Sequence, residues 1–196
     1  VFLTDGRYGE SAQALLEEIP QVPVQVYSAD LWKALAEICA GLEQVEVEAG
    51  GVTWEFVRNL EDKAGIAPRP SSGLVEELRR TKDGGELEAL RRAARAGDDA
   101  FSSLAELCGR SVTEADLAWE LVAEMRRRGG DQADWPAIVA AGAAASIPHY
   151  ETSRVPLGRG LLLLDYGCVV DGYHSDMSRT VWLEGPPDPV LAKVHA

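Results

Sequence analysis

The sequence predicts an α/β (α+β) protein of two domains. Up to residue 72, short apolar strands alternate with helices, a pattern typical of parallel-rich α/β domains. Beyond that point two helices come first, and an antiparallel hairpin marked by Asp171-Gly172 follows. We therefore expect one domain at 1–72 and a second at 73–196.

The first domain is expected to contain three strands, each followed by a helix. Runs of β-branched and aromatic residues, separated by Gly, Pro, Ser and Asp, set the limits of these elements. Strands are predicted at 2–5, 22–27 and 44–48, and helices at 6–19, 29–40 and 52–64. Residues 68–73 are polar and Pro-rich, which indicates a connector.

Two helices open the second domain. The first is Ala-rich and spans 86–108, and the second begins at the N-cap Thr113 and ends at Gly129-Gly130. Apolar residues at three- and four-residue spacing predict one buried face on each. These residues are Leu87, Leu90, Ala94, Gly97, Phe101, Leu104 and Cys108 on the first, and Leu117, Leu121 and Met125 on the second.

A β-hairpin with one carboxylate on each arm is the most informative feature of the chain. Residues 161–170 form an apolar run that only Asp165 interrupts, and residues 173–182 are expected to return beside it. Between them, Asp171-Gly172 is the residue pair that favours a two-residue type I′ loop. Asp165 lies on the outgoing arm and Asp176 on the returning arm.

The loop length fixes which residues face each other across this hairpin. If Val170 pairs with Tyr173, Ser178 lies opposite Asp165. Because side chains alternate with period two, Asp165 and Asp176 then fall on the same face as diagonal neighbours, about 7–8 Å apart at the backbone. The two carboxylates are therefore close enough to share one ion.

Two carboxylates directed at one point in an apolar strand repel each other and lose hydration. That arrangement costs several kcal/mol unless a cation or a shared proton relieves it. A divalent metal ion is one solution. In the alternative interpretation Asp165 caps a strand end and Asp176 pairs with Arg179. The position of Asp165 inside a Leu-rich run favours the metal.

These motifs carry a family resemblance. Asp165-Tyr166-Gly167 and the run from Gly172 to Thr180, with Pro148-His149-Tyr150 upstream, resemble the Xaa-Pro peptidase branch of the pita-bread metallopeptidases. That group includes prolidase, aminopeptidase P and methionine aminopeptidase. The resemblance implies an N-terminal α/β domain followed by the first half of a pita-bread catalytic domain, with a basic, strand-like opening at 79–82.

The resemblance also implies a set of site residues. In the family two Asp, one His and two Glu ligands hold two divalent ions, usually manganese, cobalt or zinc. Asp165 and Asp176 match the first two metal ligands, and His149 matches the catalytic histidine that orients the substrate beside the metals. The remaining His and two Glu ligands are not found in this sequence. We therefore expect a piece of a longer enzyme, inactive by itself.

The expected function is metal-dependent hydrolysis of Xaa-Pro peptide bonds through a metal-bridged water, by a dipeptidase or an aminopeptidase. The substrates would be short proline-containing peptides, and the resemblance implies a homodimer. The alternative is a non-catalytic pita-bread module that binds peptides or a partner protein. A decayed site has no reason to keep two mutually repelling carboxylates, so Asp165 and Asp176 argue against that alternative.

Composition indicates which binding partners are excluded and in which compartment the protein is expected. The net charge of −13 argues against nucleic acid and anionic membranes as partners, because both require a basic surface. No stretch resembles a signal peptide or a membrane span, and we expect a cytoplasmic protein. Cys39, Cys108 and Cys168 lack metal-binding spacing, which indicates reduced core residues.

Overall fold

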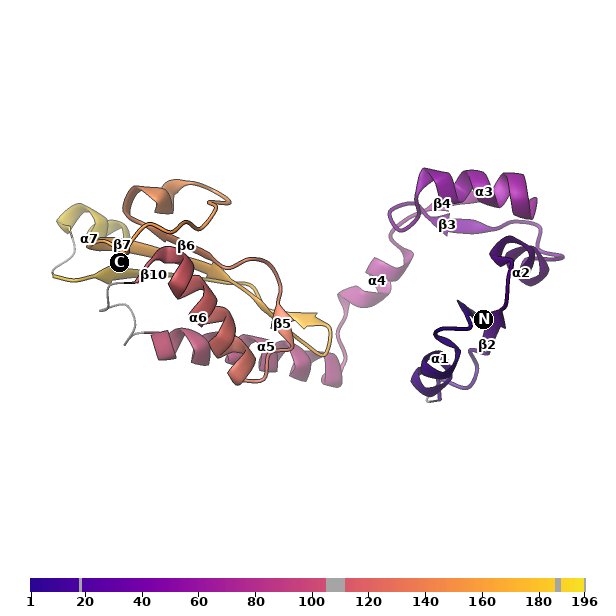
Figure 1. The fold of residues 1–196 in the computed structure, drawn as a ribbon, viewed down its shortest axis with the longest axis horizontal. Coiled ribbons are helices and arrows are strands. Elements are labelled where there is room, and N and C mark those ends of the chain that lie inside the picture. Colours follow the sequence, from indigo (N-terminus) through magenta and orange to yellow (C-terminus); the bar gives the residue numbers. More distant parts are fainter. Residues whose placement is uncertain (18, 105–111, 186–187, 196) are drawn as a thin grey trace. The chain divides into compact units, whose positions relative to one another are not determined.

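The computed structural model describes residues 1–17, 19–104, 112–185 and 188–195 (Figure 1). The chain forms two compact units, Val1–Thr81 and Lys82–Ala196. The division falls after Thr81, whereas the sequence places it at 72–73. It coincides with the start of a helix that Asp83 caps. Among the described helices, none is both long and apolar enough to cross a membrane.

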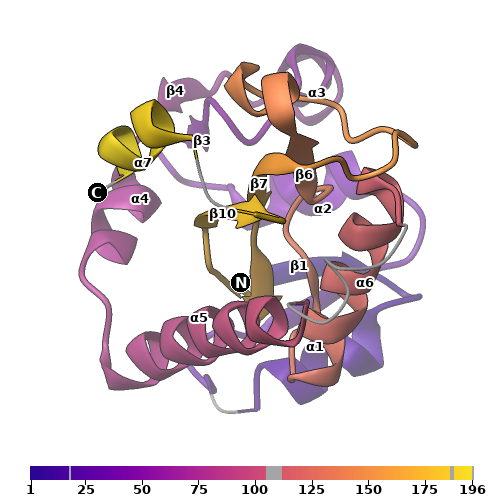
Figure 2. The same ribbon diagram turned by 90° about the vertical axis from the view of Figure 1, so that its left-hand side faces the viewer.

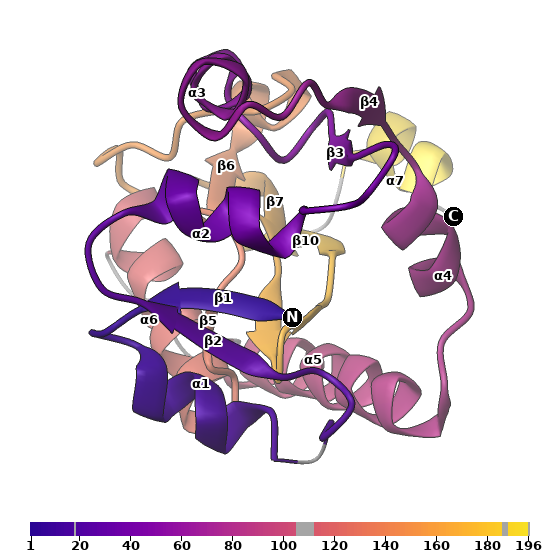
Figure 3. The ribbon, with the colours of Figure 1, turned by 90° about the vertical axis from the view of Figure 1, so that its right-hand side faces the viewer.

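Within its described residues, the first unit contains two small parallel sheets and four helices. Figure 3 shows this unit facing the viewer. Strand β1 (Phe2–Asp5) pairs with β2 (Val24–Tyr27), and β3 (Glu46–Glu48) pairs with β4 (Arg69–Ser71). The helices are α1 (Gly9–Leu15), α2 (Leu31–Ile38), α3 (Trp54–Ala64) and α4 (Leu74–Arg80). The alternation of strands with helices and the parallel pairing are confirmed.

Local side-chain chemistry sets where helices α2 and α3 begin. The Asp30 carboxylate accepts hydrogen bonds from the backbone N–H groups of Trp32 and Lys33, and the Thr53 hydroxyl accepts one from Phe56 N–H. Both bonds satisfy donors that a helix leaves free in its first turn. Gly65 caps the C-terminal end of helix α3. Its backbone is left-handed, a conformation that glycine adopts readily.

Two predictions for the first unit are wrong. Residues 68–73, expected to be a connector, include strand β4, whose edges are bonded through Arg69 N–H to Val45 O and Ala49 N–H to Ser71 O. The strand-like opening expected at 79–82 is not a strand, because Arg79 and Arg80 form the end of helix α4. Acidic residues in the first turn of α4 and arginines in its last turn interact favourably with the helix macrodipole. These charges explain why the segment forms a helix and not a strand.

In the second unit, two long helices pack side by side against two three-stranded antiparallel sheets (Figures 1 and 2). The helices are α5 (Gly84–Ser103) and α6 (Glu114–Arg127), and a short helix α7 (Pro189–His195) follows the sheets. One sheet has the order β10 (Met177–Leu183), β7 (Gly160–Tyr166), β6 (Ile138–Ala141). The other has the order β5 (Gln132–Ala133), β8 (Cys168–Val170), β9 (Tyr173–His174).

The core lies between these helices and sheets, and the predicted stripe of α6 is confirmed: Leu117, Leu121 and Met125 are buried. The predicted stripe of α5 is confirmed at Gly97 and Leu104, which are buried, but not along the whole helix. Leu87 is exposed, and the buried residues are Ala89, Ala93, Ala96, Gly97 and Ala100. Residue 108 lies outside the described residues.

Close packing explains why small residues of α5 are buried. A Cβ atom at Gly97 would lie 2.9 Å from Met177 Sδ and 3.3 Å from Tyr166 Cε2, so only the small-residue face of α5 fits against the hairpin. The Tyr166 hydroxyl donates a 3.4 Å hydrogen bond to Gly97 O from within the core. Apolar spacing alone favours larger residues such as Leu87, which is exposed, and it misses the buried alanines of this face.

The predicted hairpin register is confirmed along both arms. Val170 pairs with Tyr173 across the turn, and Ser178 pairs with Asp165 further along. Both turn residues have positive φ, 49° at Asp171 and 77° at Gly172, as a type I′ turn requires. The turn therefore sets the pairing of the whole hairpin.

The outgoing arm is not one strand, as predicted, but two. It breaks at Gly167 into β7 and β8, which belong to different sheets. A Cβ atom at Gly167 would lie 2.2 Å from Ser175 O and 2.7 Å from a ring carbon of Trp135. Backbone and indole therefore approach this residue so closely that no larger side chain fits.

We predict that Gly167→Ala lowers the free energy of unfolding by at least about 3 kcal/mol, because the backbone of Ser175 cannot move away without disrupting the hairpin. Urea unfolding of the intact protein measures the effect. Gly158→Ala is the matched control, since a Cβ there meets no atom within 4 Å. It should change stability by less than about 0.5 kcal/mol. Equal effects of the two substitutions would contradict the steric explanation.

Candidate active site

The hairpin places Asp165 in the middle of a sheet. The residue lies on the central strand β7, between Ile138 of β6 and Ser178 of β10. Its side chain accepts a 3.2 Å hydrogen bond from the Ser178 hydroxyl, and the residue is partly buried. Asp165 therefore does not cap a strand end, and that part of the alternative interpretation is wrong.

Asp176 lies between β9 and β10 and is exposed to solvent. Within the described residues, no side chain or backbone group donates a hydrogen bond to its carboxylate or forms an ion pair with it. Arg179, the partner proposed in the alternative interpretation, instead pairs with Asp98 of α5. A carboxylate beside another carboxylate, with no cation of the described chain to neutralise it, is a suitable ligand for an external cation.

One cavity contains all three predicted site residues. Its volume is about 750 Å³. Its walls come from the segment before β6, from the loop that precedes β7, and from the hairpin. The lining residues are Trp135, Pro136, Ala137, Ile138, His149, Tyr150, Glu151, Thr152, Asp165 and Asp176. The structure thus brings His149, Asp165 and Asp176 to the same space.

His149 is held in an unusual backbone conformation. It follows the short 3-10 helix η2 (Gly142–Ser146) in an exposed loop, and its φ is 53°. Residues other than glycine rarely adopt this left-handed region, and such strain concentrates at functional sites. The surrounding structure must therefore supply the energy that keeps His149 in this position.

A buried carboxylate that the sequence analysis missed lies next to this loop. Glu114, the first residue of α6, is 1% exposed. Its carboxylate accepts hydrogen bonds from Ala141 N–H, the Tyr150 hydroxyl, and the N–H and hydroxyl of Ser153. Burial raises the pKa of Glu114, but these hydrogen bonds outweigh burial and leave the pKa below its ordinary value. A glutamate following an N-cap threonine was the only signal in the sequence, and it is common to many helices.

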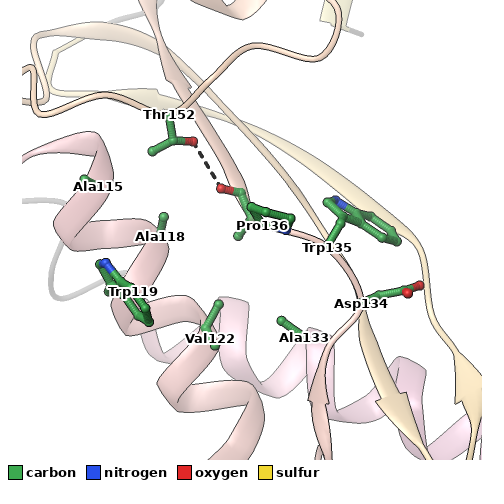
Figure 4. Close-up of a pocket in the computed structure, with 10 residues that line it drawn as sticks. Ala115, Ala118, Trp119, Val122, Ala133, Asp134, Trp135, Pro136 and Thr152 are labelled. Atoms are coloured by element: carbon green, nitrogen blue, oxygen red, sulfur yellow. Dashed lines mark hydrogen bonds between the residues drawn. The ribbon is translucent and has the colours of Figure 1, made fainter.

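A second, apolar pocket of about 530 Å³ lies between α6 and residues 133–137 (Figure 4). Trp119 stands on its helix side and Trp135 on the opposite side. Thr152 joins the loop to this wall: its hydroxyl donates to Ala137 O at 3.1 Å and accepts from Val139 N–H at 2.8 Å. Trp135, Pro136, Ala137 and Thr152 line both pockets, so these residues form a shared wall.

The donors at the site fit a hard divalent cation but form only part of a coordination shell. Asp165 and Asp176 offer carboxylate oxygens, which suit manganese, zinc and cobalt alike. Within the described part of the chain, no group of three or more His, Cys, Asp or Glu residues is arranged to hold a metal ion. The two aspartates are therefore compatible with a metal centre that needs further ligands.

Comparison with known proteins gives the class of fold. The chain aligns with a solved Xaa-Pro dipeptidase from Bacillus anthracis with a TM-score of 0.91 at 27% identity, covering 98% of this chain and 54% of the other. An X-Pro aminopeptidase from Thermotoga maritima aligns with a TM-score of 0.82 at 26% identity, covering 98% and 55%. The fold is thus an α/β domain followed by the first half of a pita-bread domain.

The family follows from the sequence comparisons. The model of metallopeptidase family M24 matches residues 88–196, and the chain belongs to that family. An uncharacterised peptidase, YqhT of Bacillus subtilis, is 30% identical over 191 residues, which cover 95% of this chain and 53% of the relative. The chain spans about half the length of the relatives it matches. Membership of a metallopeptidase family implies divalent metal cofactors.

The hydrogen bonds of Glu114 predict a pH-dependent stability. Because its folded-state pKa lies below the ordinary value of 4.5, the stabilisation from Glu114 is complete above about pH 4.5 and is lost as the pH falls through the folded-state pKa. We expect wild type to exceed Glu114→Gln in unfolding free energy at pH 7, and the difference to shrink below about pH 4. Urea unfolding across this range measures it, and a difference independent of pH would contradict the assignment.

Proposed function

We propose that the protein containing this chain is a peptidase that hydrolyses Xaa-Pro bonds with the help of two divalent ions, either manganese, cobalt or zinc. The observation that carries the proposal is the convergence of Asp165, Asp176 and His149 on one cavity, in a chain of a metallopeptidase family. The similar solved proteins named as Xaa-Pro dipeptidase and X-Pro aminopeptidase support the choice of bond.

Asp165 and Asp176 are the residues that would hold the ions. Both project from one hairpin whose register is set by the turn, so their relative position does not depend on a flexible loop. Divalent ions held in such a site would act as Lewis acids and would lower the pKa of a bound water, so that a hydroxide nucleophile is available near neutral pH. The hydroxyl of Ser178 holds one oxygen of Asp165 and thereby limits rotation of that carboxylate.

His149 has a separate role in the proposal. The residue is exposed and lines the cavity from a loop, whereas the two aspartates line it from the hairpin. From there it can orient a substrate carbonyl and donate a proton, because the imidazole N–H is a hydrogen-bond donor and histidine is the most frequent general acid in enzymes. The apolar wall of Trp135, Pro136 and Ala137 offers contact area to a proline ring.

The proposal extends to substrates, assembly and compartment. The substrates would be short proline-containing peptides, cleaved by dipeptidase or aminopeptidase action, and the enzyme would be a homodimer. A cytoplasmic location is in keeping with the thiol of Cys168, which is free and buried. Burial raises the pKa of this thiol and keeps it unreactive.

We predict that Asp176→Asn lowers Xaa-Pro hydrolysis by the intact protein more than about 100-fold and reduces bound metal. Substitution of a residue that only hydrogen-bonds to a metal ligand lowers metal affinity or activity about 10- to 100-fold. Loss of the charge of a ligand itself should lower both by more. Turnover of an Xaa-Pro dipeptide and metal content of the purified protein are the two measurements.

Glu184→Gln is the matched control, since it removes one negative charge directly after strand β10 and outside the cavity, where Glu184 pairs only with Arg159 among the described residues. It should retain metal and turnover. An inactive, metal-free wild type that folds normally would contradict the proposal and favour a non-catalytic peptide-binding module.

A further inference from the structure

The segment that carries His149 has little internal support. Helix η2 buries none of its residues, and its bonds are local: Ile147 N–H donates to Ala144 O, and the Ser146 hydroxyl donates to Ala143 O. His149 itself has the strained φ of 53°. A loop of this kind samples several conformations unless its ends are fixed.

One carboxylate accepts hydrogen bonds at both ends of this segment, and the first end is also held by the pairing of Ala141 with Leu162. Oε1 of Glu114 accepts from Ala141 N–H at 2.9 Å, directly before η2. Oε2 accepts from the Tyr150 hydroxyl at 2.9 Å, directly after His149, and from the Ser153 hydroxyl at 2.7 Å. Residues 142–149 therefore lie between two anchors that share a single side chain.

The anchor itself is rigid. Glu114 begins α6, where Thr113 and Asp116 form a reciprocal capping box. Glu114 N–H donates to Val155 O, and Ala115 N–H donates to Ser153 O, so the free donors of the first helical turn bond to the same loop. The buried stripe of α6 attaches this helix end to the core. The negative charge of Glu114 also suits the positive end of the helix.

We propose that Glu114 is a positioning residue that holds the His149 segment in its productive conformation. The proposal rests on the proposed function, because it assigns to Glu114 an effect on the reaction through His149. Its charged form is needed at both ends, since only a carboxylate can accept from Ala141 on one oxygen and from Tyr150 and Ser153 on the other. A glutamine presents an amide donor to one of these ends and releases it.

The test compares Glu114→Gln with wild type in the intact protein. We expect kcat for an Xaa-Pro dipeptide to fall about 10- to 100-fold with a smaller change in KM, because a displacement of about 1 Å in a catalytic group has effects of that size. Metal content should not change, since Asp165 and Asp176 lie on the hairpin. Hydrogen–deuterium exchange of residues 142–150 should become about tenfold faster.

Asp116→Ala is the control for a purely structural role. It removes the capping box from the same helix end but leaves all contacts of Glu114 with the loop. This variant should lose stability while kcat and exchange at 142–150 stay at wild-type values. An equal loss of kcat in both variants would overturn the proposal, as would unchanged exchange in Glu114→Gln.

Ser153→Ala covers the case in which Glu114→Gln does not fold. It removes one donor to Glu114 and does not line the cavity, so a smaller rise in exchange, about threefold, and a smaller fall in kcat are expected. No change in either quantity would overturn the proposal. Failure of the proposed function can be told apart from failure of this proposal. If the wild type is inactive, kcat gives no information, but hydrogen–deuterium exchange of residues 142–150 can still be compared between the wild type and the three variants.

Discussion

The register of the hairpin is the constraint on which the rest of the site depends. Side chains on a strand alternate between two faces, so a shift of one residue would turn Asp165 away from Asp176 and into the opposite face. The turn at Asp171-Gly172, where both residues have positive φ, prevents that shift. Gly167 contributes the second restraint, because the backbone of Ser175 passes so close to it that only glycine is accommodated.

Helix α5 stabilises this register because it packs closely against the hairpin. Gly97 of α5 gives room for Met177 and Tyr166, and the alanine face of α5 lets helix and strands approach. Helix α6 has a double role, since its buried stripe belongs to the core while its first residue, Glu114, reaches the loop that carries His149. The hairpin and the loop thus share one rigid support, which allows groups distant in sequence to face one cavity.

The hairpin, its register and the buried stripe of α6 could be predicted because each follows from local patterns: a turn pair, alternation and helical spacing. The buried face of α5 could be predicted only in part, at Gly97 and Leu104, because its buried alanines are selected by close neighbours that the sequence does not reveal. Strand β4 contains Pro70, and its pairing depends on a distant partner, β3. Glu114 was missed for the same reason: its four hydrogen bonds come from residues 27 to 39 positions away. The roles of His149, Asp165 and Asp176 stay predictions.

The central claim is that Asp165 and Asp176 hold the same metal centre. The most direct measurement is a crystal structure of the intact protein grown with Zn²⁺, using anomalous scattering at the zinc absorption edge to locate the ions. We expect an anomalous peak within about 2.0–2.2 Å of a carboxylate oxygen of each aspartate, in the cavity that His149 lines. An active, metal-dependent enzyme whose ordered zinc lies elsewhere, with neither aspartate as a ligand, would contradict it.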